Sequence, residues 1–183
     1  MDIITNLKSN IINFKDIPVS VFLAVSLTVI FSLYLTTLIK TIPCQRDIMS
    51  SFISNFIHTD ISHLLVNLFA LYSLARVERD IGPKKFIKLL VFLLVFNTII
   101  ETIIYKIFPT IKCSIGFSSV LFGIMTYELI TTKKLDFMLL ASVVGTIILP
   151  SLKNQNVSLV GHIIGVISGG ILGGFLSNKF QLI

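Results

Sequence analysis

Residues 157–176 read VSLVGHIIGVISGGILGGFL, a run with one histidine and no Lys, Arg, Asp or Glu. About 20 apolar residues are needed to cross the hydrocarbon core of a bilayer as an α-helix, so this run predicts a membrane-spanning helix. Four of its six glycines recur at every fourth position, a spacing that lets a neighbouring backbone approach one face of the helix closely. They are Gly161, Gly165, Gly169 and Gly173.

Five further charge-poor runs precede this one along the chain. They occupy residues 17–39, 61–77, 86–107, 115–132 and 135–152, and the last span is expected over 157–177. The 183 residues are 54% hydrophobic and 13% charged, with a mean hydropathy of +0.93, so the chain has far less polar surface than a soluble domain needs. We therefore predict an all-α, polytopic membrane protein, a bundle of six transmembrane helices that forms one membrane-embedded domain over residues 1–183. The first run is too long for a removable signal peptide and is expected to stay as a helix.

Membrane topology explains the net charge of +6 better than nucleic-acid binding does, because the basic residues are dispersed among short loops. Ten of the 15 Lys and Arg residues lie in segments that would share one side of the membrane with the N-terminus. Cytoplasmic loops carry an excess of Lys and Arg. We therefore predict that the N-terminus and the C-terminus are both cytoplasmic, and the identity of the membrane and the oligomeric state stay open.

Three residues lie near the predicted outer border of the membrane. Cys44 follows the first span and Cys113 precedes the fourth, on the side where a disulfide persists. Spacing alone leaves both a bridge and two unpaired thiols open. Glu101 lies near the outer end of the third span, and we expect its carboxylate to reach the headgroup layer.

Four polar residues are expected at one depth. Under this topology the second, fourth and sixth spans all run from outside to inside, so their first turns lie in the outer half of the bilayer. These turns contain His63 and Asn67, four residues apart on one helix face, Ser118 at the start of the fourth span, and His162 in the sixth. The second span is capped by either Thr59 or Asp60. Polar groups inside a membrane span are costly and indicate a functional site.

The chemistry of these residues fits a nucleophilic hydrolase. A serine hydroxyl needs an adjacent base to take its proton, and the chain has three histidines, His58, His63 and His162. Hydrolysis of an acyl group also needs donors for the developing oxyanion. Taken singly, each residue has a structural alternative, such as a small packing residue for Ser118 or interhelical hydrogen bonding for Asn67.

The chain resembles the rhomboid family of intramembrane serine proteases. The resemblance rests on three motifs in order: His58, His63 and Asn67; Gly116-Phe117-Ser118; and Gly161-His162 at the start of a glycine-rich helix. It covers nearly the whole chain, because the predicted spans correspond to the six-helix core of the family.

The resemblance implies a role for each matched residue. Ser118 would be the nucleophile and His162 the general base and acid, in a dyad without a third carboxylate. His63, Asn67 and the Ser118 amide would form the oxyanion hole, with His58 and Gly116 completing the motifs. The remaining matches are Phe122, where the family often has an aromatic ring against the catalytic histidine, Arg46 of a Trp-Arg motif, and Glu78 with Gly82 of a Glu-x3-Gly motif.

Two departures from the family pattern concern the site. Ser119 follows the nucleophile where the family commonly has glycine, which reduces the backbone freedom of the oxyanion loop. Gln45 stands in place of the tryptophan of the Trp-Arg motif, a change that concerns the anchoring of the first loop.

These residues predict an intramembrane serine endopeptidase that cleaves single-span transmembrane proteins near the extracytoplasmic side. One alternative is a catalytically inactive rhomboid-like protein that binds transmembrane segments for trafficking or degradation. Another is a small transporter or channel, but its polar residues would line a path across the whole membrane. No cofactor or metal is expected, since no Cys or Glu completes a His-Glu-x-x-His or similar arrangement. No nucleic-acid partner is expected.

Overall fold

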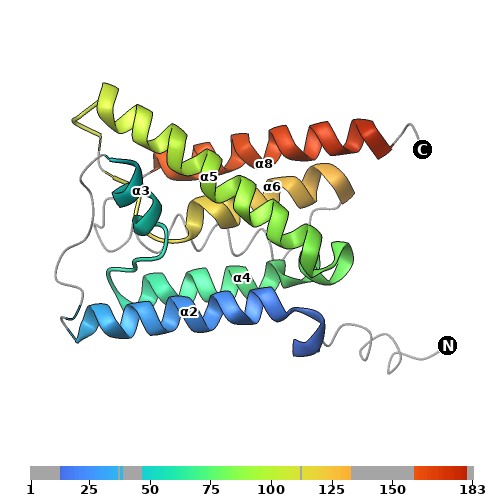
Figure 1. The fold of residues 1–183 in the computed structure, drawn as a ribbon, viewed down its shortest axis with the longest axis horizontal. Coiled ribbons are helices and arrows are strands. Elements are labelled where there is room, and N and C mark those ends of the chain that lie inside the picture. The colour runs from blue at the N-terminus through green and yellow to red at the C-terminus, as the bar shows by residue number, and fades with distance from the viewer. Residues whose placement is uncertain (1–12, 37, 39–46, 112, 133–158, 181–183) are drawn as a thin grey trace.

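The computed structural model describes residues 13–36, 38, 47–111, 113–132 and 159–180. Within these ranges the chain is all-α, with a short 3₁₀ turn followed by six α-helices (Figure 1). The elements are η1 (Phe14–Asp16), α2 (Pro18–Leu35), α3 (Ile48–Ser54), α4 (Ile61–Ile81), α5 (Pro83–Ile107), α6 (Ser118–Thr132) and α8 (Leu159–Phe180). The predicted fifth span, residues 135–152, lies outside the described residues.

The helix boundaries follow from capping chemistry. Asp60 is the N-cap of α4, and its carboxylate accepts the backbone N–H of His63 at 2.9 Å, which decides between the two capping residues that the sequence left open. Gly82 ends α4 with φ +82°, a conformation that glycine adopts without a steric cost. Pro83 then occupies the first turn of α5, where its missing N–H is not needed.

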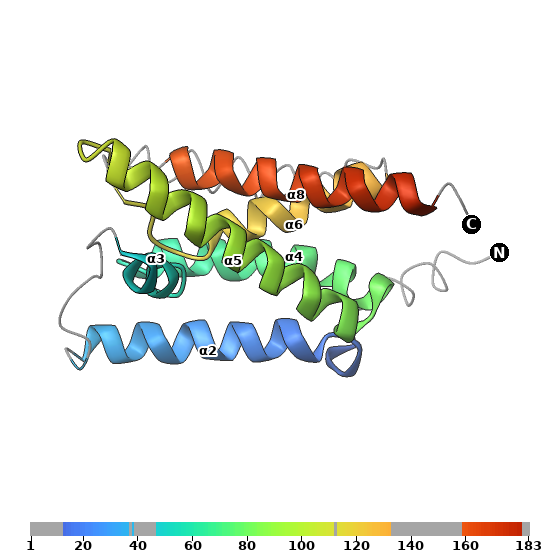
Figure 2. The ribbon, with the colours of Figure 1, turned by 45° about the horizontal axis from the view of Figure 1, so that its top comes forward.

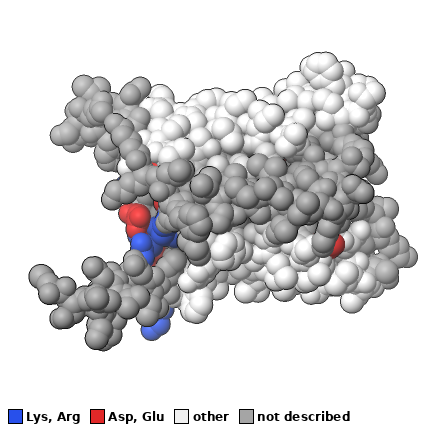
Figure 3. Space-filling model, turned by 180° about the vertical axis from the view of Figure 1, so that it is seen from behind, with Lys and Arg blue, Asp and Glu red and all other residues white. Residues whose placement is uncertain are grey.

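Two of the described helices, α2 and α5, are long and apolar enough to cross a membrane, with mean hydropathies of 2.1 and 2.2. A shorter apolar stretch, Leu159–Phe175, lies in α8. Large apolar side chains such as Phe22, Phe69 and Phe175 are exposed on the outside of the bundle. Over the described residues, Figure 3 shows a mostly uncharged face, with the coloured Lys, Arg, Asp and Glu atoms mainly at one end. This surface suits a lipid environment.

The helices α4, α6 and α8 run in the same direction, so that their first residues lie at one end of the molecule (Figure 1). The helix α2 lies beside α4 and runs in the opposite direction, and α5 crosses obliquely over α4 and α6 (Figure 2). The start of α2 and the end of α8 are both at the other end of the bundle (Figure 1). This arrangement brings together residues that are far apart in the sequence.

The helix α6 lies at the centre of the bundle. Every residue from Ser118 to Ile124 is buried, and Val120 and Ile124 belong to the hydrophobic core with Leu27, Leu71 and Leu93 of neighbouring helices. The helix is therefore surrounded on all sides over its first two turns, the part that begins with Ser118.

The glycine face of α8 packs against α6, which confirms the close approach predicted from the glycine spacing. A Cβ atom added to Gly165 would collide with the carbonyl oxygen of Ser119, and one added to Gly169 would collide with that of Gly123. Because two helices touch through their backbones here, side chains on either side of the contact are held at short range.

An ion pair joins α4 to α6 near their last turns. Arg76 Nε lies 2.6 Å from Glu128 Oε1, and Arg76 Nη2 donates to Glu128 Oε2 at 3.2 Å. Such a two-point guanidinium–carboxylate contact fixes orientation as well as distance. It lies at the opposite end of both helices from His63 and Ser118.

The expectation that Glu101 reaches the headgroup layer is wrong. The helix α5 continues beyond Glu101 to Ile107, and the Glu101 side chain is only 1% exposed. Its Oε1 lies so near Gly161 that a Cβ there would be 3.1 Å away. The absence of a side chain at Gly161 therefore makes room for this carboxyl group between α5 and α8.

Cys113 is disulfide-bonded in the structure, so the interpretation of two unpaired thiols is not supported for this residue. The chain has one other cysteine, Cys44, which lies outside the described residues.

Candidate active site

The side chains of Ser118 and His162 lie in contact at the start of α6 and in the second turn of α8. Ser118 Oγ is 3.0 Å from His162 Nε2. The two side chains are buried, with 3% and 6% of their surface exposed. A hydroxyl within hydrogen-bond reach of an imidazole nitrogen is the arrangement in which the ring can act as a base toward the oxygen. The other ring nitrogen, Nδ1, has no hydrogen-bond partner among the described residues.

The ring of Phe122 fixes the plane of the His162 imidazole. The two rings are stacked, with centroids 4.4 Å apart and planes inclined by 25°. Phe122 lies one helical turn after Ser118, so its side chain shares a face of α6 with the hydroxyl. One helix therefore contacts His162 both at Nε2 and on the ring face.

The turn before α6 depends on Gly116. This residue has φ +98°, a left-handed conformation that side chains disfavour. A Cβ added to it would lie 2.6 Å from Cε1 and 2.7 Å from Nε2 of His63. The Gly116 N–H donates to the carbonyl oxygen of Ser54 in α3 at 2.9 Å. Glycine is thus required both by the backbone and by the neighbouring ring, and the turn starts α6 at Ser118.

The structure places His63 against the turn that holds Ser118, because the His63 ring packs on Gly116. Asn67 is fully buried on the same helix and its Nδ2 donates to the His63 carbonyl at 2.8 Å, while its Oδ1 has no partner among the described residues. The first N–H groups of an α-helix have no partner within the helix, and Ser118 is the first residue of α6. The N–H groups of Val120 and Leu121 donate to the Phe117 carbonyl, and the Ser118 N–H, which precedes them, is a donor that can face a developing negative charge.

His58 supports this arrangement from the segment between α3 and α4. Its ring is completely buried and meets the His63 ring edge to face, at a centroid separation of 5.0 Å. Burial lowers the pKa of His58 from 6.5 to about 3, so the imidazole is neutral at pH 7. A neutral ring avoids the cost of a buried charge beside His63.

Glu78 lies at the far end of α4 and caps a different helix. Its carboxylate accepts the backbone N–H groups of Val19 and Ser20 at 2.8 and 2.7 Å, and the Ser20 hydroxyl at 2.7 Å. The N-cap residue of α2, Ile17, supplies no such side-chain bond. Glu78 therefore satisfies the first turn of α2 from outside that helix. The other supporting residue, Arg46, lies outside the described residues.

The sequence analysis did not identify one polar contact beside the dyad. Ser119 Oγ donates to Asn55 Oδ1 at 3.1 Å, and both residues are buried. In the sequence, Ser119 is visible only as a departure from the family pattern, and Asn55 lies outside the three matched motifs. The only indication in the sequence that Asn55 belongs near the site is its position three residues before His58.

No group of three or more His, Cys, Asp or Glu side chains in the described part of the chain has a geometry that could hold a metal ion. His58 and His63 are neighbours, but the described residues supply no third ligand to them.

Comparison with known proteins supports the motif-based resemblance. Residues 45–179 match the model of the Rhomboid domain family, a range that contains all the residues of the candidate site described above. A protein of Acanthamoeba polyphaga mimivirus that carries the name of a putative rhomboid protein is 32% identical over 126 residues, which cover 68% of this chain and 73% of that protein.

Proposed function

The chain belongs to the rhomboid family, and from that premise we propose that it is an intramembrane serine protease with a Ser118–His162 dyad. The observation that carries the proposal is the 3.0 Å contact between Ser118 Oγ and His162 Nε2 inside an integral membrane protein. A protein that only binds transmembrane segments has no need of this pairing.

In the proposed reaction, Ser118 Oγ attacks the scissile carbonyl carbon while His162 Nε2 takes the hydroxyl proton. The tetrahedral intermediate collapses as His162 returns the proton to the leaving amine, and an acyl-enzyme remains. Water then attacks the ester with the same imidazole as its base, which releases the second product and restores the hydroxyl. The Phe122 ring keeps the imidazole in its plane through both steps.

The negative charge of the intermediate needs preorganised donors. We assign this role to the His63 ring, the Asn67 amide and the Ser118 backbone N–H. Removing one donor of this type typically costs about 3–4 kcal/mol of transition-state stabilisation. The contact of the His63 ring with Gly116, two residues before the nucleophile, supports its assignment.

The substrate class follows from the location of the dyad. Ser118 and His162 lie at the end of the bundle where α4, α6 and α8 begin (Figure 1), and the topology assigned from the sequence puts ten of the 15 Lys and Arg residues on the other side of the membrane. Since the excess of Lys and Arg marks the cytoplasmic side, cleavage is assigned to the extracytoplasmic half of the membrane. A hydrogen-bonded helix hides its amides, so single-span substrates whose upper turns contain helix-weakening residues are preferred.

The test compares cleavage of a single-span substrate in liposomes by the wild type, Ser118→Ala and His162→Ala. Both variants are expected to lose activity by about 10³-fold or more, because each removes one member of the reacting pair. Thermal unfolding in detergent controls for loss of the fold. A serine-reactive phosphonate is expected to label the wild type and not Ser118→Ala.

Equal cleavage by all three proteins would overturn the proposal. A wild type that binds the substrate without cleaving it and resists the phosphonate would instead favour the catalytically inactive rhomboid-like alternative.

A further inference from the structure

We propose that Asn55 and Ser119 form a positioning pair that holds the nucleophile of this chain in register with its base. The inference rests on the proposed function and adds to it two residues that act on Ser118 through the backbone. Ser119 and Asn55 are 0% and 2% exposed, and their side chains are joined at 3.1 Å.

Asn55 is itself held in place by its own helix. Its Nδ2 donates to the carbonyl oxygens of Ser51 at 2.9 Å and Phe52 at 3.3 Å. These bonds orient the amide so that Oδ1 is left to accept the Ser119 hydroxyl. The acceptor is therefore fixed before Ser119 meets it, which is the property of a positioning contact.

The end of α3 contacts the nucleophile segment on both sides of Ser118. Before Ser118, the Gly116 N–H donates to the Ser54 carbonyl at 2.9 Å. After Ser118, the Ser119 hydroxyl donates to Asn55. The last residue of α3, Ser54, and its C-cap, Asn55, thus hold residues 116 and 119, and Ser118 lies between these two attachments.

Ser119 is also in contact with the helix that carries the base. Its carbonyl oxygen lies against Gly165 of α8, in the turn after His162, so closely that a Cβ at Gly165 would collide with it. Ser119 is therefore packed between α3 and α8. Any shift of Ser119 changes the position of Ser118 relative to His162.

The pair is specific to a chain with serine at position 119. The rhomboid family commonly has glycine after the nucleophile, and glycine has no hydroxyl to satisfy. A buried hydroxyl without a partner is costly, and Asn55 supplies the partner here. The hydrogen bond to Asn55 also restricts the Ser119 side chain, and this restriction stabilises one position of the first turn of α6.

The test is a double-mutant cycle with Ser119→Ala and Asn55→Ala, in which kcat and KM for a single-span substrate are measured in liposomes. Each single variant is expected to lower kcat by about 5- to 30-fold, since it leaves a buried group unpaired and frees the start of α6. The KM is expected to stay within about twofold, because neither side chain is placed in the substrate path. The double variant is expected to be no slower than the slower single variant.

The matched control is Ser168→Ala. Ser168 is also a fully buried serine, but its hydroxyl donates to the Gly165 carbonyl of its own helix, so its loss is expected to leave kcat unchanged. Ser119→Cys keeps the size of the side chain with a weaker donor, and is expected to have a kcat between those of the wild type and Ser119→Ala. This variant also serves if the alanine variant does not fold.

The outcomes separate the two proposals. A wild type that neither cleaves a substrate nor reacts with the phosphonate overturns both the protease assignment and the positioning pair. An active wild type with unchanged kcat in Ser119→Ala, or with losses that multiply in the double variant, overturns only the pair. A lowered melting temperature with unchanged kcat has the same meaning, because the contact would then be structural alone.

Discussion

The buried position of His58 makes the protonation of its ring part of the stability of the protein. Both ring nitrogens of His58 lack hydrogen-bond partners among the described residues. The His58 ring packs against the His63 ring, which lies against Gly116. The native state holds this imidazole neutral, whereas an unfolded chain exposes it to water. Stability therefore depends on pH through His58.

We predict that acid destabilises the protein through this residue. The unfolded His58 binds a proton below its ordinary pKa of 6.5, but the native pKa is about 3. Between these values the unfolded state binds more protons, so stability falls as the pH falls, by at most about 1.4 kcal/mol per pH unit from this group. Melting temperatures in detergent from pH 7 to pH 4 are expected to fall more steeply for the wild type than for His58→Gln. Parallel curves would contradict the prediction.

Some residues of the site could be predicted from the sequence and others could not. Ser118 and His162 stand out because polar groups in apolar spans are rare, and equal depth in parallel helices already brings them near one another. The contact of Ser119 with Asn55 could not be foreseen, since α3 lies in a connecting segment whose placement no span fixes. The burial of Glu101 depends on the crossing of α5 and α8, which hydropathy does not specify.

At the scale of elements, the contact of α6 with α8 decides the geometry of the dyad. These helices meet where glycine backbones replace side chains, at Gly165 and Gly169. The glycine spacing predicted this approach, because small residues at every fourth position form one face. It did not predict which helix the face meets, since that depends on the packing of the whole bundle.

We predict that Gly165→Ala separates the two helices. The added methyl group would collide with the Ser119 carbonyl, and overpacking of this kind typically costs about 1–3 kcal/mol. Cleavage is expected to fall along with the melting temperature, because the same displacement widens the gap between Ser118 and His162.

The matched control for this prediction is Gly174→Ala on the same helix, where nothing lies within 4 Å of the added Cβ. Alanine there is expected to be neutral or to stabilise the helix by up to about 1 kcal/mol. Equal effects of the two substitutions would show that helix propensity, and not the contact with α6, controls the result.

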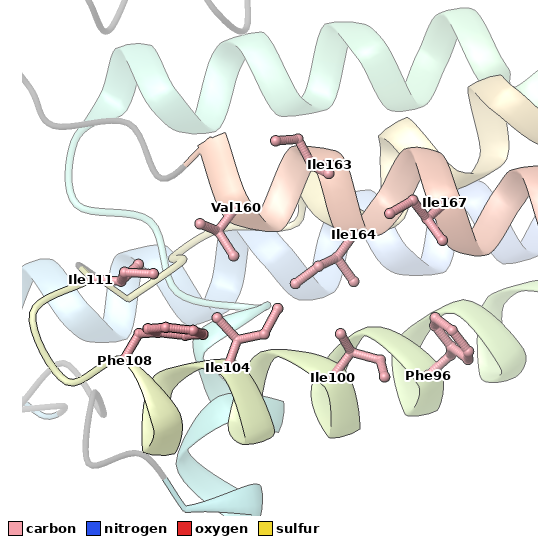
Figure 4. Close-up of a pocket in the computed structure, with 9 residues that line it drawn as sticks. All are labelled: Phe96, Ile100, Ile104, Phe108, Ile111, Val160, Ile163, Ile164 and Ile167. Atoms are coloured by element: carbon pink, nitrogen blue, oxygen red, sulfur yellow. The ribbon is translucent and has the colours of Figure 1, made fainter.

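An apolar groove with a volume of about 370 Å³ lies between α5 and α8 (Figure 4). Its walls come from the sides of Ile100 and Ile104 on one helix and of Ile163 and Ile167 on the other. The described residues that line the groove are all apolar, and neither Ser118 nor His162 is among them.

At the scale of the whole molecule, the fold class and family predicted from the sequence are confirmed by the all-α bundle and by the match to the Rhomboid domain. Apolar runs with short loops leave few ways to fold in a bilayer, since every backbone group must be satisfied within its own helix. The orientation of the bundle in the membrane stays a prediction from charge.

We predict that the turn between α4 and α5 faces the cytoplasm and the segment after α5 faces outward. Lys85, in the first turn of α5, and Thr110, in the segment after α5, are both exposed and are replaced by cysteine in separate variants. A membrane-impermeant maleimide is expected to label Thr110→Cys in intact cells, and Lys85→Cys only after permeabilisation. The wild type is the control for background labelling, and its Cys113 is not expected to react because this residue is disulfide-bonded. The reverse pattern would invert the assigned topology.

The Arg76–Glu128 ion pair joins α4 to α6 at the end of the bundle away from the dyad. Thirteen helical steps separate Arg76 from His63, a length of about 20 Å at 1.5 Å per residue. If α4 tilts by about 3° about the ion pair, its opposite end moves by about 1 Å relative to α6. Errors of that size at reacting atoms can cost about a hundredfold in rate. A charge-neutralising change at Glu128 would therefore disturb the chemistry from a distance, without touching any group that takes part in it.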